Sequence, residues 1–237
     1  MCGRFVSTAT PAQLADFFGA TVDTDPLGPS YNVAPTNDVY AIVEADGVPT
    51  VRSFQWGLVP IWAKDAKVGS KMINARAETL AEKPSFKSLF KSRRLIVPMD
   101  GFYEWQAIAG HKTKQPMFIH RCDGAPLAVA GLWTAWKDKQ AGPDAPWLHT
   151  CTVITASANA LMAPIHDRMP AILEREQWSE WLDGDEHDLA ALGALLAPAP
   201  AGVLEAYPVS TAVNAVRNKG AELIEQVPPT EADQPSS

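Results

Sequence analysis

The stretch LIVPMDG, residues 95–101, is a short apolar run that stops abruptly at Asp100 and Gly101. Short runs that are apolar or β-branched and end at Gly, Pro or Asp are typical of β-strands. We therefore predict a strand over Leu95–Pro98. Five other segments have the same character: Val39–Val43, Val51–Trp56, Met117–His120, Leu127–Leu132 and Thr150–Thr155.

Helices are predicted around these strands. Thr10 is a favoured N-cap, Pro11 suits the first helical position, and Leu14, Phe17 and Phe18 are spaced for one buried face. Similar patterns predict helices at Ser85–Lys91, Ser157–Met162, Arg175–Leu182 and Glu186–Leu196. These segments do not alternate regularly with the strands, which argues against a doubly wound sheet. We expect an α+β fold with curved, mostly antiparallel, barrel-like β-sheets flanked by helices.

We expect a single domain, because the chain of 237 residues contains no internal repeat and no low-complexity linker that would divide it. The predicted domain covers residues 1–226. The last stretch, VPPTEADQPSS, is polar and rich in proline, and such a composition favours disorder. Residues 227–237 are therefore predicted to form a disordered tail.

The composition, with 46% hydrophobic residues, can supply a real core. No apolar run approaches the roughly 18 residues that a membrane span needs, and the N-terminal MCGRFVSTAT lacks the apolar stretch of a signal peptide. We expect a monomeric, cytoplasmic protein with no membrane partner. The widely spaced Cys2, Cys122 and Cys151 predict neither a disulfide framework nor a metal site.

The net charge of -7 argues against a protein that coats nucleic acid with its whole surface. The charge is unevenly distributed, since the segment from Arg52 to Lys114 holds 12 Lys or Arg against 5 Asp or Glu. A basic surface for nucleic acid is available from this middle third alone. Composition is equally compatible with ordinary solvated charge.

Cys2 follows the initiator methionine, and its small size permits removal of Met1, which would leave an α-amine and a thiol on one residue. An α-amine titrates at about 7.7 to 8.0, so a fraction is neutral at physiological pH and can attack an aldehyde to give an imine. The thiol then closes onto the imine carbon to form a five-membered thiazolidine ring. By position alone, however, a cysteine at residue 2 is usually incidental.

Seven short motifs are spread along the chain. They are MCGR (1–4), YNVAPT (31–36), WGLVPIWA (56–63), NARAET (74–79), GFYEW (101–105), IHDRMP (165–170) and VS…VN (209–214). Each motif is weak by itself, but all seven in this order resemble the SRAP family, the SOS-response-associated peptidase or abasic-site-processing proteins. The resemblance runs from Met1 to about Gln226.

The resemblance implies that Cys2 is the nucleophile and that Asn74, Glu104 and His166 surround it as catalytic residues. Imine formation needs a group that moves protons, which the carboxyl of Glu104 can do. Histidine exchanges protons near neutral pH, so His166 can assist ring opening, imine reversal or β-elimination of the 3′ phosphate. Asn74 offers donors and an acceptor that can orient the amine or a sugar hydroxyl. Without the motifs, these three residues would be interpreted as ordinary surface and turn residues.

The resemblance also suggests DNA contacts. Arg4 and Arg76 are predicted phosphate clamps, because a guanidinium can contact phosphate through two hydrogen bonds, although surface ion pairing is the alternative. Trp62 and Trp105 are predicted to stack on bases beside the lesion, at about 1 to 3 kcal/mol per base, whereas a core position is the alternative for a tryptophan. Two further positions are predicted to line the site, Pro35 and Thr155.

The resemblance implies an enzyme that senses abasic sites in single-stranded DNA and shields them by a covalent thiazolidine crosslink through Cys2. Autoproteolytic removal of Met1 and AP-lyase activity are expected beside it. This scheme requires no metal and no organic cofactor. The expected partners are single-stranded DNA containing abasic sites and replication-fork proteins, met on the nucleoid when DNA is damaged.

Two other functions are compatible with the same residues. In an N-terminal-nucleophile cysteine peptidase or hydrolase, the thiol of Cys2 would attack an amide instead of forming a ring with an aldehyde. A non-covalent single-stranded DNA-binding module would use the basic middle third and its aromatic residues. Such a module would bind DNA whether or not a lesion is present.

Overall fold

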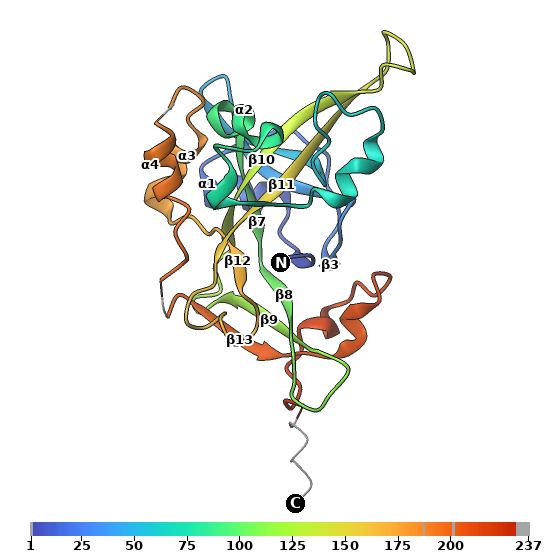
Figure 1. The fold of residues 1–237 in the computed structure, drawn as a ribbon, viewed down its shortest axis with the longest axis vertical. Coiled ribbons are helices and arrows are strands. Elements are labelled where there is room, and N and C mark those ends of the chain that lie inside the picture. Colours follow the sequence, from blue (N-terminus) through green and yellow to red (C-terminus); the bar gives the residue numbers. More distant parts are fainter. Residues whose placement is uncertain (1, 187, 201, 231–237) are drawn as a thin grey trace, which may run out of the picture.

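The computed structural model describes residues 2–186, 188–200 and 202–230, which form two sheets with short helices around them (Figure 1). The helices are α1 (Pro11–Phe18), α2 (Pro84–Ser92), α3 (Trp178–Leu182) and α4 (Leu189–Ala194). The strands are β1 (Phe5–Ser7), β2 (Thr21–Val22), β3 (Ser30–Val33), β4 (Asp38–Ala45), β5 (Val48–Trp56), β6 (Asn74–Arg76), β7 (Arg94–Met99), β8 (Gly101–Gln106), β9 (Gln115–Arg121), β10 (Leu127–Lys137), β11 (Trp147–Ser157), β12 (Arg168–Pro170) and β13 (Leu204–Pro208).

The larger sheet closes on itself. Its strand order is β12–β11–β10–β7–β4–β5–β2, with β6 beside β11, and β11 also pairs in parallel with β5 through Thr150–Gln55 and Cys151–Trp56. The strands β5, β4, β7, β10 and β11 therefore form a ring, which removes the exposed edges that an open sheet would have. The expected α+β fold with a barrel-like, mostly antiparallel sheet is confirmed. All six predicted strands are present, as β4, β5, β7, β9, β10 and β11.

The apolar stretch that includes Leu95–Pro98 forms β7, which lies between β4 and β10 in this ring. Leu95 and Val97 face an inner core built from both sheets, whereas Ile96 faces an outer core beneath the helices. All three side chains are fully buried. Because successive residues of a strand point to opposite faces, a strand buried on both sides becomes a continuous apolar run.

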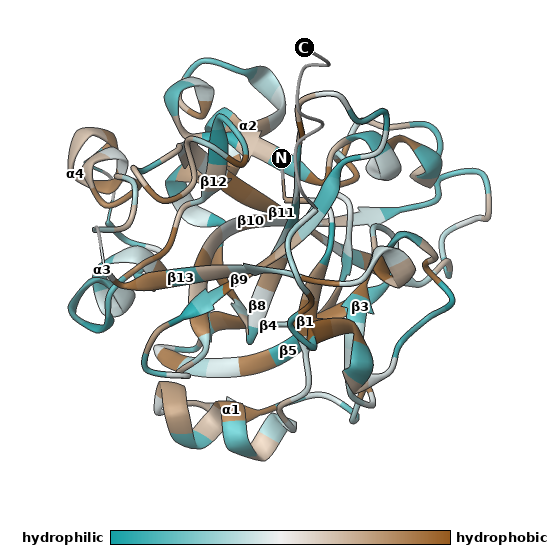
Figure 2. Cartoon of the chain, turned by 90° about the horizontal axis from the view of Figure 1, so that it is seen from below, coloured by the Kyte–Doolittle hydropathy of each residue, from teal (hydrophilic) through white to brown (hydrophobic). Residues whose placement is uncertain are grey.

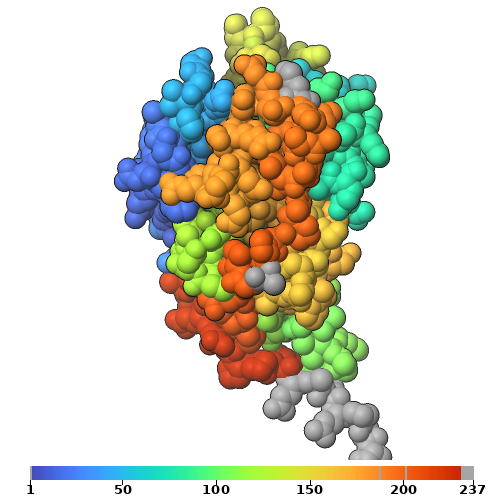
Figure 3. Space-filling model, turned by 90° about the vertical axis from the view of Figure 1, so that its left-hand side faces the viewer, coloured from blue at the N-terminus to red at the C-terminus, as the bar shows by residue number. Residues whose placement is uncertain are grey.

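The helices cover the outer core. Thr10 caps α1 and exchanges hydrogen bonds with Gln13 in a capping box, and the helix buries Leu14 and Phe18, as predicted. The helix α1 lies on one side of the molecule, next to β5, along the lower edge of Figure 2. The segment that carries α3 and α4, orange in Figure 3, covers another part of the outer core, in which it buries Trp181 and Leu192. The last predicted helix is shorter than expected, because Asp188 caps α4 and the helix begins at Leu189.

The helix predicted over Ser157–Met162 is wrong. Ser157 is the last residue of β11, and the chain then makes a turn in which the N–H of Ala163 donates to the carbonyl of Asn159 at 2.9 Å. Pro164 follows at once and has no N–H for a further helical hydrogen bond. A helix-like spacing of apolar residues therefore supports only one turn here.

The first residues of the predicted tail contact the body of the protein. Val227 N donates to the carbonyl of Pro208 at 2.9 Å, and Thr230 Oγ1 donates to Gln115 Oε1 at 2.6 Å. The remaining residues of the predicted tail, 231–237, lie outside the described residues. Within the described ranges, no helix is long and apolar enough to cross a membrane.

The smaller sheet, with the order β13–β9–β8–β1–β3, packs beside the barrel and carries the N-terminus. β1 pairs with β8 through Phe5 and Phe102, and Tyr103 N donates to the carbonyl of Arg4 at 3.0 Å. Phe5 contacts the barrel residue Trp56 edge to face, with ring centroids 5.1 Å apart. These contacts hold residues 2–7 against the inner core.

A buried arginine joins the helices to β7. Arg94 is 3% exposed, and its guanidinium donates to main-chain carbonyls at the ends of α2 and α3 and in the loop after α3. The acceptors belong to Phe90, Lys91, Trp181, Asp183 and Glu186. One side chain thus satisfies carbonyls that the two helices leave without a partner at their C-terminal ends.

We expect Arg94→Met to lower the free energy of unfolding by at least about 3 kcal/mol, because each buried carbonyl left without a donor costs about 1 to 3 kcal/mol. Arg93→Met is the matched control, since Arg93 is exposed and stacks over Trp133 at 4.3 Å. The control should lose less than about 1 kcal/mol. Urea unfolding followed by tryptophan fluorescence measures both, and equal losses would contradict this role of Arg94.

Candidate active site

Cys2 lies three residues before the start of β1, with its side chain fully buried in the inner core. Its main chain is held from the barrel side, because Asn74 Nδ2 donates to the carbonyl of Cys2 at 2.8 Å. Asn74 begins β6, which pairs in parallel with β11 and places Asn74 opposite Val153. The barrel thus fixes the predicted nucleophile through a side chain 72 residues away.

Glu104 approaches the same cysteine from the smaller sheet. It lies on β8 opposite Met117 and is 3% exposed. Burial raises the pKa of the Cys2 thiol well above its ordinary value, and the charge of Glu104 raises it further. The neighbouring backbone N–H of Arg4 acts in the opposite direction and lowers it. The thiol is therefore held protonated, with a carboxylate at hand.

Asn74 has a second polar atom in the site. Its Oδ1 is buried and accepts no hydrogen bond from any described residue. A buried carbonyl oxygen without a donor costs free energy, so such atoms are rare unless they serve a ligand or a reacting group. Asn74 therefore offers an unused acceptor beside the main chain of Cys2.

His166 ends the turn that follows β11. The turn is joined to the end of β8 by a hydrogen bond from Gln106 Nε2 to the carbonyl of Pro164 at 3.2 Å. The Nδ1 atom of His166 lies 3.0 Å from the N–H of Arg168 and 2.8 Å from Asp167 Oδ1. Neutral Nδ1 accepts from Arg168, whereas a protonated ring donates to Asp167. Both partners therefore meet the same ring nitrogen, and whether Nδ1 carries a hydrogen decides which of them it bonds.

Two of the predicted DNA contacts meet at one short segment. Arg4 Nη1 donates to the carbonyl of Val213 at 3.0 Å, and Trp105 Nε1 donates to Asn214 Oδ1 at 2.7 Å. Both acceptors belong to the 3₁₀ helix Thr211–Asn214. The structure therefore brings Arg4 and Trp105 together on the side of the site formed by the smaller sheet.

Three other predicted contacts are placed by turns and strand ends. Trp62 is 64% exposed in the loop after β5, and the exposed Arg76 ends β6, two residues after Asn74. Pro35 is half-buried in the turn between β3 and β4, beside Thr36, which has a φ of 73°. A β-branched residue in this left-handed region is strained, and such strain is concentrated at functional sites.

Thr155 is fully buried on β11, and Arg168 lies over it. The hydroxyl of Thr155 donates to the carbonyl of Ala75 at 3.4 Å, while Arg168 Nη2 donates to the carbonyl of Thr155 at 2.5 Å. Arg168 also makes a two-point ion pair with Glu78, at 2.7 and 2.9 Å. A direct contact between Thr155 and DNA would require Arg168 to move.

Our sequence predictions did not single out the Glu78–Arg168 ion pair, nor Asn32, a buried residue whose Oδ1 accepts from Arg4 at 3.1 Å. The sequence did contain a signal for them, because Glu78, Arg168 and Asn32 all lie inside the quoted motifs. Among the described residues, no group of three or more His, Cys, Asp or Glu side chains is placed to hold a metal ion.

The family of this chain is shown by its match to a family model. A family model described as SOS response associated peptidase (SRAP) matches residues 1–216. The chain belongs to the SRAP family. The resemblance inferred from the seven motifs is thereby confirmed, and the SRAP match includes the first residues of the chain, where Cys2 and Arg4 lie.

Relatives and solved structures extend this SRAP assignment. The chain is 44% identical over 227 residues to abasic site processing protein YoqW of Bacillus subtilis, covering 95% of this chain and 99% of the relative. It is 36% identical over 238 residues to abasic site processing protein YedK of Escherichia coli, covering 96% and 100%. A crystal structure of a Bacteroides thetaiotaomicron protein matches with a TM-score of 0.84 at 28% identity, covering 95% of this chain and 100% of that one.

The buried thiols predict a loss of stability at alkaline pH. Burial raises the pKa of Cys2 and Cys151 above the ordinary value of 9.0, so the folded protein keeps protons that the unfolded chain releases above that pH. The stabilisation is complete well below pH 9 and declines above it, by up to about 1.4 kcal/mol per pH unit for each thiol.

Urea unfolding at pH 7 and pH 10 measures this loss. Cys151→Ala should reduce the difference between the two pH values, because it removes one of the buried thiols. Cys122→Ala is the control, since Cys122 is exposed, and it should leave the difference unchanged. If the wild type, Cys151→Ala and Cys122→Ala all lose the same stability between pH 7 and pH 10, the buried thiols are not the source of that loss.

Proposed function

We propose that this protein recognises abasic sites in single-stranded DNA and caps them covalently through the amine and thiol of Cys2. The observation that carries the proposal is the arrangement at Cys2, whose carbonyl is held by Asn74 and whose thiol lies near Glu104. The relatives named abasic site processing proteins support the same lesion as substrate. Removal of Met1 is the first step, because only a released amine can attack an aldehyde.

The second step joins amine and aldehyde. The neutral amine of Cys2 adds to the aldehyde carbon of the ring-opened deoxyribose, which forms a C–N bond and a hydroxyl on the same carbon. A proton delivered by Glu104 lets that hydroxyl leave as water, and a protonated imine remains, whose C=N nitrogen keeps its hydrogen. Asn74 Oδ1 can accept a hydrogen bond from the amine and thereby orient its lone pair toward the aldehyde.

The third step closes the ring. The sulfur of Cys2 forms a bond to the imine carbon, the C=N bond becomes a single bond to a neutral N–H, and the thiol proton passes to the carboxylate of Glu104. Because burial and Glu104 raise the pKa of this thiol, no standing thiolate is available. The proton must leave as the sulfur attacks, and the carboxylate of Glu104 is the base for this transfer.

An imine that the thiol does not capture has a second fate. Removal of a proton from the sugar carbon next to the imine expels the 3′ phosphate by β-elimination and cleaves the strand. His166 can take this proton at Nε2 in the tautomer in which Nδ1 carries the hydrogen and donates it to Asp167 Oδ1. Lyase activity is therefore part of the proposal, as a side reaction of slow ring closure.

Single-stranded DNA is held by charge and stacking. Arg4 and Arg76 would contact phosphates on either side of the reacting sugar, and Trp62 and Trp105 would stack on flanking bases. Pro35 would border the sugar, and Thr155 would do so once Arg168 has moved off it. The proposal also includes replication-fork proteins as partners. It places the protein on damaged DNA in the nucleoid.

A peptidase is the second candidate, favoured by the description of the family model. The same Cys2 thiol would then attack an amide carbonyl, with the Met1–Cys2 bond as the nearest substrate. The two reactions need different acceptors. A peptidase would process a peptide without DNA, whereas the proposed reaction consumes one abasic site per protein.

Glu104→Gln should slow crosslinking to an abasic strand by about 100-fold or more, since general acid–base catalysis contributes about 10² to 10⁴. Binding to an undamaged strand should change less than threefold, because the phosphate contacts are kept. Gel-based crosslinking rates and fluorescence anisotropy measure the two properties. Equal losses in both would make Glu104 a binding or structural residue.

Cys2→Ser keeps the amine and replaces the thiol by a hydroxyl, which closes onto an imine less readily. We expect this variant to stop at the imine, which borohydride traps, and to cleave more of the strand by β-elimination. Wild-type protein should give a stable crosslink without reductant. Durable crosslinks from Cys2→Ser without borohydride would contradict the role of the thiol, and a misfolded variant would show no trapping at all.

A further inference from the structure

Two cationic side chains meet at the buried Asn32. Arg4 Nη1 donates to Asn32 Oδ1 at 3.1 Å, and Lys219 Nζ donates to the main-chain carbonyl of the same residue. The amide of Asn32 donates in turn to three carbonyls of the segment that leads to Lys219, those of Val213, Ala215 and Asn218. Asn32 therefore fixes Arg4 and Lys219 relative to each other.

Neither cation is neutralised by the described part of the chain. Arg4 donates to Asn32 Oδ1 and the carbonyl of Val213, and Lys219 donates to the carbonyl of Asn32 and to Asn37 Oδ1 at 3.4 Å. All four acceptors are neutral oxygens. Burial lowers the pKa of both groups, and the charge of Arg4 lowers that of Lys219 further. Two positive charges thus lie near each other without an anion.

Both cations keep donors available. Arg4 uses only Nη1 within the described residues, so its Nε and Nη2 have no acceptor there. Lys219 has three N–H donors and two acceptors. Hydrogen bonds from charged donors to an oxyanion are about twice as strong as neutral ones. The pair therefore has the number of donors and the charge that an oxyanion requires.

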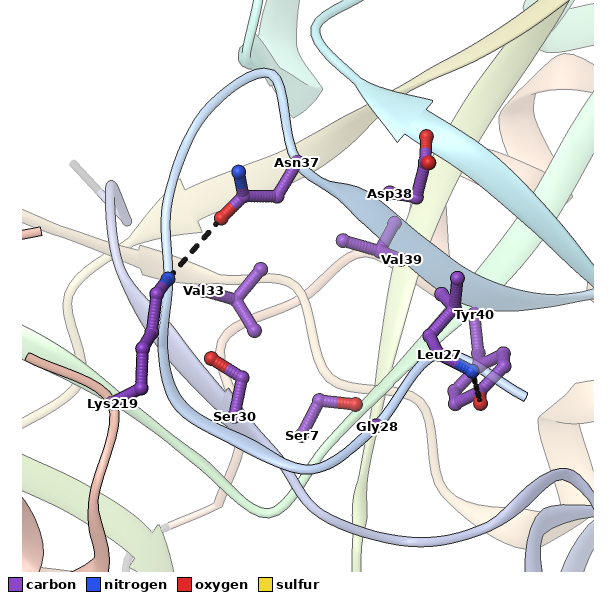
Figure 4. Close-up of a pocket in the computed structure, with 10 residues that line it drawn as sticks. All are labelled: Ser7, Leu27, Gly28, Ser30, Val33, Asn37, Asp38, Val39, Tyr40 and Lys219. Carbon is purple, nitrogen blue, oxygen red and sulfur yellow. Dashed lines mark hydrogen bonds between the residues drawn. The ribbon is translucent and has the colours of Figure 1, made fainter. Parts of the chain in front are cut away.

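The space beside Lys219 is an open pocket of about 290 Å³ (Figure 4). Lys219 lies to the left of Ser30 and Val33 in this view, with Asn37 above them. The carboxylate that also lines the pocket, Asp38, lies on the far side from Lys219 (Figure 4). A group bound at Lys219 thus reaches the ammonium without passing next to that negative charge.

We propose that Arg4 and Lys219, joined through Asn32, form a two-cation site that binds a backbone phosphate of the DNA strand beside the reacting sugar. The proposal rests on the function proposed above, and it assigns to Lys219 a role that none of the seven motifs indicates. Arg4 is two residues from Cys2, so a phosphate at this pair belongs to a nucleotide next to the lesion. Asn32 is a positioning residue, because it is fully buried and holds both cations.

The test uses Lys219→Met and binding to an undamaged single-stranded oligonucleotide at several chloride concentrations. On single strands, log K falls as log salt rises, and the loss of one phosphate contact reduces the magnitude of this slope by about 0.7. We expect this decrease, with several-fold weaker binding at low salt, for Lys219→Met. Lys219→Arg keeps the charge and should retain the wild-type slope. Lys139→Met, which removes an exposed lysine on the β10–β11 hairpin, is the matched control and should leave the slope unchanged.

An unchanged slope for Lys219→Met overturns the proposal, as does the same decrease for Lys219→Arg or Lys139→Met. Free phosphate is the other source of this anion. If inorganic phosphate at constant ionic strength stabilises the wild type more than Lys219→Met while the DNA slopes are equal, the site takes phosphate and the DNA assignment is wrong. An undamaged strand carries no aldehyde, so these results do not depend on Cys2. Lesion-dependent crosslinking with equal slopes rejects only the two-cation site, and a decreased slope without crosslinking rejects only the covalent function.

Discussion

The site depends on the pairings of one strand, β11, which is bonded to β10, β5, β6 and β12. The parallel pairing with β5 closes the barrel, and the one with β6 delivers Asn74 to the carbonyl of Cys2. The pairing with β12 sets Arg168 opposite Ser157, at the end of the turn that carries His166. Residues from three distant motifs are therefore positioned by hydrogen bonds to a single rigid element.

The surroundings of Cys2 favour a reaction that is controlled by geometry. A thiol poised to attack by itself has a lowered pKa, usually beside a cation. Here burial and a carboxylate act in the opposite direction, so the thiol stays protonated until a bound aldehyde is present. This arrangement fits an amine that reacts first and a sulfur that follows, and it protects a buried cysteine from unrelated reactions.

The sequence was sufficient to predict those elements whose physical signal is local. Strands such as β7 and β10 are buried on both faces, so their apolar runs predicted them directly, and the capped start of α1 was equally clear. The pair of strands that closes the barrel could not be predicted, because the parallel contact of Cys151 with Trp56 joins residues far apart in sequence and leaves no local pattern. The four predicted catalytic residues came from the family resemblance. The roles of Asn32 and the Glu78–Arg168 pair depend on contacts that only the folded chain makes.

The central claim is that one residue, Cys2, supplies both the amine and the sulfur that capture an abasic site. The most direct measurement is the intact mass of the purified protein after incubation with abasic or undamaged single strands, without reductant. We expect a protein that begins at Cys2 and that gains, with the abasic strand only, the mass of that strand less one water. No gain, a gain with the undamaged strand, or a full gain by protein that still carries Met1 would contradict it.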